Sequence, residues 1–260
     1  MKKIKRMTEC ARALFLARKM YPHKSVPSPN QKKGEPTKLS PILRKLTAKQ
    51  GFAIFKQMEK EGYVFKVHIS VDKNQKLEEI PCANLPAKVA CAPWVTTACA
   101  ASGCYALKGN FLFDRVGFAS WKNFYLAVHH TDQFFRQIGV WIDFHRPRFF
   151  RWHSAGDIQN QRYYDNMVVI AEANMGTKFL VFTKKYKLDY SIRPKTLAVV
   201  LSAWPGHPVY NPLDLPVAYM QDGTEDRMTE ADLECPGSCM TCAACWNLPK
   251  LKINAVFPKH

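Results

Sequence analysis

The stretch Arg151-Trp152-His153-Ser154-Ala155-Gly156-Asp157 decides the fold that we predict for this chain. It follows two phenylalanines and precedes a polar segment that opens a predicted helix near Gln161. A strand that ends in polar groups and a glycine, and then leads into a helix, is how α/β folds build ligand sites. We therefore expect His153, Ser154 and Asp157 at the carboxyl end of one strand. The alternative is a polar strand-to-helix turn in which Asp157 is only a helix cap.

The residues around this stretch predict a βαβ unit, in which two parallel strands are joined by a right-handed crossover. The first strand is 148–153, the helix runs from about 162 to 173, and the second strand is 178–183. Further strands are expected at 196–202, 215–220 and 254–257. With about five or six strands, the main domain at residues 76–260 is predicted to be a partial (β/α) barrel rather than a complete eight-fold one.

The first 75 residues are predicted to form a basic, mainly helical extension of this domain. Apolar periodicity, proline content and alternation give four segments there: a helix at 3–20, a linker at 21–38, a helix at 40–61 and a strand at 63–71. One long helix is expected at 118–144, after a loop-rich segment that holds four cysteines.

The positive charge of the chain is concentrated in the N-terminal extension. The net charge is +17, from 38 basic and 21 acidic residues. Residues 1–60 hold 16 Lys and Arg and 3 Asp and Glu, which gives +13, and the other residues hold 22 and 18, which gives +4. Such a basic arm suits a phosphate backbone, so a nucleic acid is an expected partner; the alternative is a solvated basic helix. No run of apolar residues is long enough to predict a membrane span, and the basic start has no signal-peptide pattern, so we expect a cytoplasmic protein.

Eight of the nine cysteines lie in two clusters, and clustered cysteines in a chain without an export signal are typical of metal sites. The second cysteine group has spacings of three, two and two residues with small residues between: Cys235, Cys239, Cys242 and Cys245. Four thiolates at such spacing can hold one zinc ion or one four-iron cluster, and the spacing does not separate the two. The alternative is a loop of reduced or disulfide-paired cysteines.

The first cluster is looser: Cys82 lies upstream, and the three cysteines that we call the first cysteine group are Cys91, Cys99 and Cys104. Three thiolates leave an open coordination position on a cluster, which a catalytic iron–sulfur centre needs if a substrate is to reach the metal. The alternatives are a structural zinc with one further ligand, or buried thiols. The sequence gives no role to Cys10 or Cys82.

The order of these motifs resembles that of the phage "gene product 88" family over about residues 80–248. The resemblance rests on the first cysteine group with Tyr105-Ala106, on the stretch 151–157, on Phe182-Thr183-Lys184, and on the second cysteine group with Trp246. More distantly, the chain resembles radical S-adenosylmethionine enzymes, which are partial (β/α) barrels.

The more distant resemblance implies a role for each site residue. The first cysteine group would hold a four-iron cluster whose open iron binds S-adenosylmethionine. Gly156 and Asp157 would approach the amine of that cofactor, and His153 and Ser154 would contact cofactor or substrate. Lys184 would meet a carboxylate or a phosphate. The cysteine spacing and the single glycine differ from those of that family, and the second cysteine group would be an auxiliary centre.

Two other functions remain open from the residues. In one, the chain is a non-enzymatic zinc protein that binds nucleic acid, with His153 and Asp157 as a buried hydrogen-bonded pair. In the other, it is a phage factor that binds a host protein through its basic arm. The sequence names no substrate and no oligomeric state.

Overall fold

The computed structural model of the 260-residue chain describes residues 40–71, 77–96, 99, 104–204, 206–221 and 232–258. The predicted basic helix at 3–20, the linker at 21–38 and Cys10 lie outside these residues. Within the described part, the chain forms the mixed α/β fold that the sequence predicts.

The centre of the fold is a parallel sheet of seven strands in the order β1-β2-β3-β4-β5-β7-β6. The strands are β1 Cys82–Ala83, β2 Phe149–Trp152, β3 Lys178–Thr183, β4 Leu197–Ser202, β5 Val217–Met220, β6 Leu233–Glu234 and β7 Ala255–Phe257. The predicted count of five or six is wrong, because the two-residue strands β1 and β6 are too short to give an alternation pattern. Among the described residues, β1 and β6 are the two edge strands of the sheet and do not pair with each other, so the predicted barrel is not confirmed.

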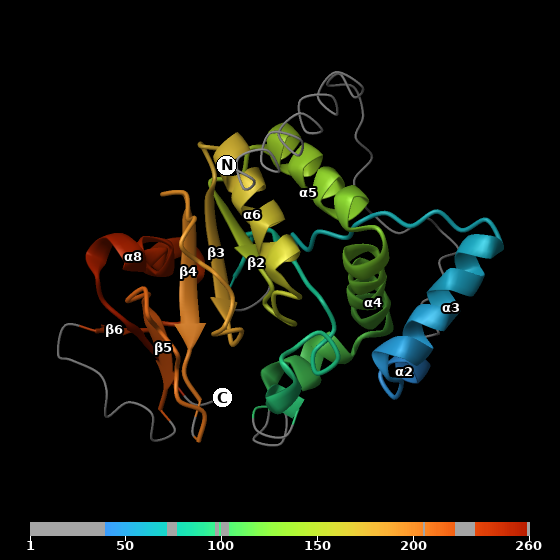
Figure 1. Ribbon diagram of the computed structural model, residues 1–260, viewed down its shortest axis with the longest axis horizontal. Helices are drawn as coiled ribbons and strands as arrows, with labels where there is room; N and C mark the ends of the chain where they lie inside the picture. Colours follow the sequence, from blue (N-terminus) through green and yellow to red (C-terminus); the bar gives the residue numbers. More distant parts are fainter. Residues whose placement is uncertain are drawn as a thin grey trace.

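The sheet buries apolar side chains on both faces, as a parallel sheet requires. Phe150 and Trp152 point to the larger buried cluster, which contains side chains of three long helices, α4 Asp114–His129, α5 Thr131–His145 and α6 Gln161–Ala173. Phe149 and Leu180 point to a second cluster with Trp246 and residues of the C-terminal segment. Figure 1 shows the same layers, with α5 and α6 on one side of the strands and the short helix α8 Leu248–Leu251 on the other.

The helices of the described part differ from prediction at two breaks. They are α2 Ser40–Leu43, α3 Ala48–Lys60, α4 Asp114–His129, α5 Thr131–His145, α6 Gln161–Ala173, α7 Cys239–Cys242 and α8 Leu248–Leu251, with short 3-10 turns η2 Pro93–Thr96, η3 Tyr105–Leu107, η4 Gly109–Leu112 and η6 Ala244–Asn247. The predicted helix 40–61 is divided because Thr47 caps α3 through a reciprocal bond with Gln50. The predicted helix 118–144 is divided at His130, where the Thr131 hydroxyl donates to the Ala127 carbonyl that would accept the Thr131 N–H in a continuous helix.

The segment predicted as a strand at 63–71 is extended but joins no ladder. Its sheet contact is an isolated antiparallel bridge between Ser70 and Cys82. Its alternation has another cause, because Phe65, Val67 and Ile69 are buried in the larger cluster, together with Phe55 of α3. None of the helices in the described ranges combines the length and the hydropathy that a membrane crossing needs.

Candidate functional site

The carboxyl ends of β1 and β2 are joined by one side chain, Asn84. Its Oδ1 accepts hydrogen bonds from the backbone N–H groups of Ser154 at 2.8 Å and Ala155 at 3.1 Å, and from the Ser154 hydroxyl at 2.8 Å. The Ser154 N–H also lies 3.2 Å from the Cys82 sulfur, and the Tyr105 hydroxyl donates to the Ser154 carbonyl. The turn after β2 is therefore held in one conformation by residues that follow β1 and the first cysteine group.

Gly156 is required by the backbone of this turn. Its φ is +86°, which L side chains rarely adopt, and a Cβ there would lie 2.6 Å from the Cβ of Leu85. The Leu85 N–H donates to the Ala155 carbonyl at 3.0 Å, so the two loops approach at backbone distance. In the structure, the glycine allows a close approach between two loops of the chain itself.

Asp157 is buried and links the carboxyl end of β2 to that of β3. Its Oδ1 accepts from the Ile158 N–H and the Thr183 hydroxyl, both at 2.7 Å, and its Oδ2 accepts from the Lys184 N–H at 2.9 Å. Burial raises the pKa of this carboxyl, and the three hydrogen bonds oppose the rise. Asp157 thus fixes the backbone of Lys184, and its Oδ2 accepts one of the two hydrogen bonds that a carboxylate oxygen can accept.

His153 points into the core on the helical side of the sheet. It is 3% exposed, its φ is +57°, and its ring centroid lies 5.5 Å from that of Tyr163 in α6. Burial lowers the pKa of His153 to about 4, so the ring is neutral at pH 7. Its Nδ1 lies 2.9 Å from the Ala83 carbonyl, which can only accept, so Nδ1 carries the proton. Nε2 is then a bare acceptor, and neither it nor the Tyr163 hydroxyl has a hydrogen-bond partner among the described residues.

The first cysteine group gathers at the carboxyl edge of the sheet, beside Trp204, which follows β4. Cys99 is buried there and Cys91 and Cys104 are partly buried against the same apolar cluster. A hydrogen bond between the Cys99 and Cys104 thiols raises the pKa of Cys99 and lowers that of Cys104 to about 6. Burial raises the pKa of Cys91 to about 11, with the nearby Asp157 carboxylate as a smaller cause. The three thiols are therefore neighbours, and the hydrogen bond within the pair favours the thiolate of Cys104 over that of Cys99.

Lys184 supplies the positive charge of this edge. Its Nζ lies 5.6 Å from the centroid of the Trp204 ring. Its charge opposes the rise of the pKa of Cys91 and of Cys99, and lowers that of Cys104. The structure thus brings together the first cysteine group, Lys184 and Asp157, which the sequence places in three separate segments.

The second cysteine group lies in the C-terminal segment that covers the other face of the sheet. Cys239 and Cys242 begin and end the single turn α7, and Ala243 then reverses the chain in a left-handed conformation. Burial raises the pKa of Cys245 to about 12, and the other three cysteines of the group add to the rise. The indole Nε1 of Trp246 lies 3.3 Å from the Phe150 carbonyl of β2, which anchors this segment to the sheet.

The chemistry of both cysteine groups fits a thiolate centre, since each combines clustered sulfurs with a nearby cation. Among the residues that the structure describes, however, no three or more His, Cys, Asp or Glu side chains are arranged as a ready site for a metal ion. The kind of donors therefore fits a metal centre, but the described side chains do not form one as they are arranged.

The structure gives four residues of this region a role that was not predicted from the sequence. They are Asn84, Cys82, Tyr105 as a contact of Ser154, and Arg151 as a neighbour of the second cysteine group. Asn84 follows β1, which is only two residues long, so its position at a strand end could not be inferred from alternation. Arg151 stands inside the stretch 151–157 but points to the opposite face from Trp152.

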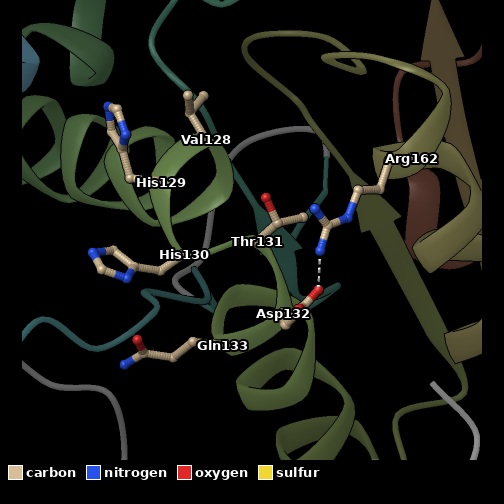
Figure 2. Close-up of a pocket in the computed structure, with 7 residues that line it drawn as sticks. All are labelled: Val128, His129, His130, Thr131, Asp132, Gln133 and Arg162. Atoms are coloured by element: carbon tan, nitrogen blue, oxygen red, sulfur yellow. Dashed lines mark hydrogen bonds and ion pairs between the residues drawn. The ribbon is translucent and has the colours of Figure 1, made fainter. Parts of the chain in front are cut away.

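A pocket lies elsewhere, at the break between α4 and α5. It has a volume of about 310 Å³ and is lined by Val128, His129, His130, Thr131, Asp132, Gln133 and Arg162. Figure 2 shows the ion pair of Arg162 with Asp132 at its rim, 2.7 Å between Nη2 and Oδ1. None of the predicted site residues lines this pocket.

A family model described as "Gene product 88" matches residues 55–227, which is more than half of the chain. The match begins earlier than the predicted resemblance and ends before the second cysteine group. No curated protein and no solved structure matches the chain.

Proposed function

The chain belongs to the gene product 88 family, and from that premise we propose that it is an iron–sulfur protein that cleaves S-adenosylmethionine reductively. The observation that carries the proposal is the grouping of Cys91, Cys99 and Cys104 with Lys184 at the carboxyl edge of a parallel sheet. In open α/β sheets this edge is where ligands bind. The second cysteine group would hold an auxiliary centre.

The number of cysteines favours a reactive centre at the first group. Three thiolates can hold a four-iron cluster and leave one iron open, and such a cluster would supply electrons to a bound cofactor. Lys184 offsets the negative charge of the thiolates and stays available to a carboxylate or phosphate. The apolar surroundings, with Trp204 and partly buried Trp94, limit the access of water.

The turn after β2 would position these groups. Asp157 fixes Lys184 through its backbone N–H and has one acceptor site left on Oδ2 for the amine of the cofactor. Ser154 and His153 are bonded within the protein, so in this proposal they shape the turn that the cofactor meets. The proposal includes the finer features of a partial (β/α) barrel, a cytoplasmic location where thiols stay reduced, and a nucleic acid as substrate.

The test is anaerobic reconstitution of the full-length chain with iron and sulfide, followed by incubation with S-adenosylmethionine and a strong reductant. We expect a brown protein that forms 5′-deoxyadenosine. Cys99→Ser should lose the iron of this site and the product together, whereas Asp157→Asn should keep the iron and form less product. Cys82→Ser is the matched control for iron content, because Cys82 is a buried thiol outside both cysteine groups.

Two results would contradict the proposal. One is a full cluster at the first cysteine group with neither cofactor binding nor 5′-deoxyadenosine. The other is a colourless protein that retains zinc, which would favour the structural zinc alternative.

A further inference from the structure

Arg151 lies on the face of the sheet that the second cysteine group covers. It pairs with Leu180 in the register of β2 and β3, and Leu180 belongs to the buried cluster of that face. Its guanidinium carbon is 4.7 Å from the centroid of the Phe182 ring, two residues further along β3. Cys239 is buried in the same cluster, and Cys245 and Phe182 pack against it.

The charge of Arg151 has no carboxylate partner among the described residues, where arginines form ion pairs at Arg44–Asp114 and Arg162–Asp132. Its Nε is buried and lacks a hydrogen-bond partner there. The side chains grouped on this face with Phe182 include Cys239 and Cys245, whose thiols can become anions. A half-buried cation without an anionic partner is unfavourable, since buried charges are normally paired.

Metal binding would remove this imbalance, because cysteine binds metals as the thiolate. Four thiolates carry more negative charge than one zinc ion or one four-iron cluster neutralises, so a cation beside them is stabilising. We propose that Arg151 is the counter-ion of an anionic metal–thiolate centre held by Cys235, Cys239, Cys242 and Cys245. This inference rests on the auxiliary centre of the proposed function and makes Arg151 a positioning residue for it.

Zinc affinity of the full-length chain tests the proposal, with Zn²⁺ in competition with a chromophoric chelator. The difference in bound zinc between the parent chain and Cys245→Ser is assigned to the second cysteine group. We expect Arg151→Gln to weaken this binding about tenfold or more, as partners of metal ligands commonly do, and Arg151→Lys to weaken it less. Arg148→Gln is the matched control: Arg148 is on the same chain segment, 5.0 Å from the Phe149 ring, but is exposed. The zinc affinity of Arg148→Gln should stay close to that of the parent chain.

Thermal unfolding separates this role from a structural one. Without metal, Arg151→Gln removes an unpaired cation, so its midpoint should fall no further than that of Arg148→Gln. With zinc, Arg151→Gln should gain less stability than the parent.

Equal zinc affinity of Arg151→Gln and the parent, or an equal loss in Arg148→Gln, would overturn the counter-ion role. A parent chain whose zinc binding does not depend on Cys245 would overturn it through the absence of the auxiliary centre. Neither result affects the iron and product readouts of Cys99→Ser, so failure of the proposed function is recognised separately.

Discussion

At the scale of single residues, the buried imidazole of His153 makes stability depend on pH. Burial lowers its pKa from 6.5 to about 4 in the folded chain. Between these values the unfolded chain binds a proton that the folded chain does not, so the free energy of unfolding rises with pH across this window. The contribution is fully present above pH 6.5 and is lost as the pH falls toward 4. The pKa difference of about 2.5 between the unfolded and the folded chain corresponds to about 3 kcal/mol in the free energy of unfolding.

His153→Asn should abolish this dependence. Asparagine tolerates the positive φ of the site and does not titrate. We expect the parent to gain up to about 3 kcal/mol relative to the variant between pH 4 and pH 6.5. Urea unfolding of both proteins across this pH range measures the difference between their free energies of unfolding. Asp157 and the other titratable groups are present in both proteins, so their contributions cancel in this difference. A constant difference at all pH values would mean that His153 is not buried in the neutral form.

For the stretch 151–157, the sequence predicted the position at a strand end but not the orientations and contacts of the side chains. It placed His153, Ser154 and Asp157 at the end of a strand, and β2 ends at Trp152. It could not show that Asn84 satisfies Ser154, or that His153 turns toward Tyr163 at a positive φ. These are contacts with distant segments, and alternation carries no information on them.

At the scale of elements, the long and buried strands were the predictable ones. The predicted strand 178–183 has the same limits as β3, and β4, β5 and β7 begin within two residues of their predicted starts. A continuous apolar run fits a strand buried on both faces, which explains this success. The extended segment at 63–71 has the same pattern but packs its side chains without a ladder, so periodicity there reported burial and not pairing.

The link between β1 and β2 through Asn84 gives a prediction at this scale. Asn84→Ala removes the acceptor of the Ala155 N–H and leaves the Ser154 N–H only the Cys82 sulfur. We expect a loss of about 1–3 kcal/mol in the free energy of unfolding, the cost of an unsatisfied buried group. Asn84→Asp keeps an acceptor oxygen and should lose less. Urea unfolding compares the two variants, and equal losses would show that Asn84 acts through packing alone.

At the scale of the whole molecule, the two cysteine groups lie at different places on one sheet. The first is at the carboxyl edge with Lys184, and the second is on one face near Arg151. The sequence could identify each group by its spacing, because those cysteines are close along the chain. It named Lys184 as a contact of a carboxylate or a phosphate, but it could not show that Lys184 and Arg151 lie near the thiols, because that follows from the parallel order of β2, β3 and β4.

The basic arm is the remaining property of the whole chain, and most of it lies outside the described residues. Residues 1–38 hold 11 Lys and Arg and 2 Asp and Glu, which gives +9. We propose that they bind the phosphate backbone of a nucleic acid. Each phosphate contact releases counterions, so the logarithm of affinity should fall with the logarithm of salt concentration by about 0.7 to 0.9 per contact.

Deleting residues 1–38 should therefore flatten this salt dependence and leave the iron content of the protein unchanged. The measurement is the affinity for generic single- and double-stranded oligonucleotides at several salt concentrations, for the full chain and the truncated one. Replacing Lys32 and Lys33 with Glu changes the charge of the arm by −4 without shortening the chain, so it should lower the slope by less than the deletion, which removes a charge of +9. Binding that is equally strong and equally insensitive to salt with and without the arm would exclude an electrostatic role. The residual +8 of residues 39–260, from 27 basic and 19 acidic residues, would then have to account for any affinity that remains.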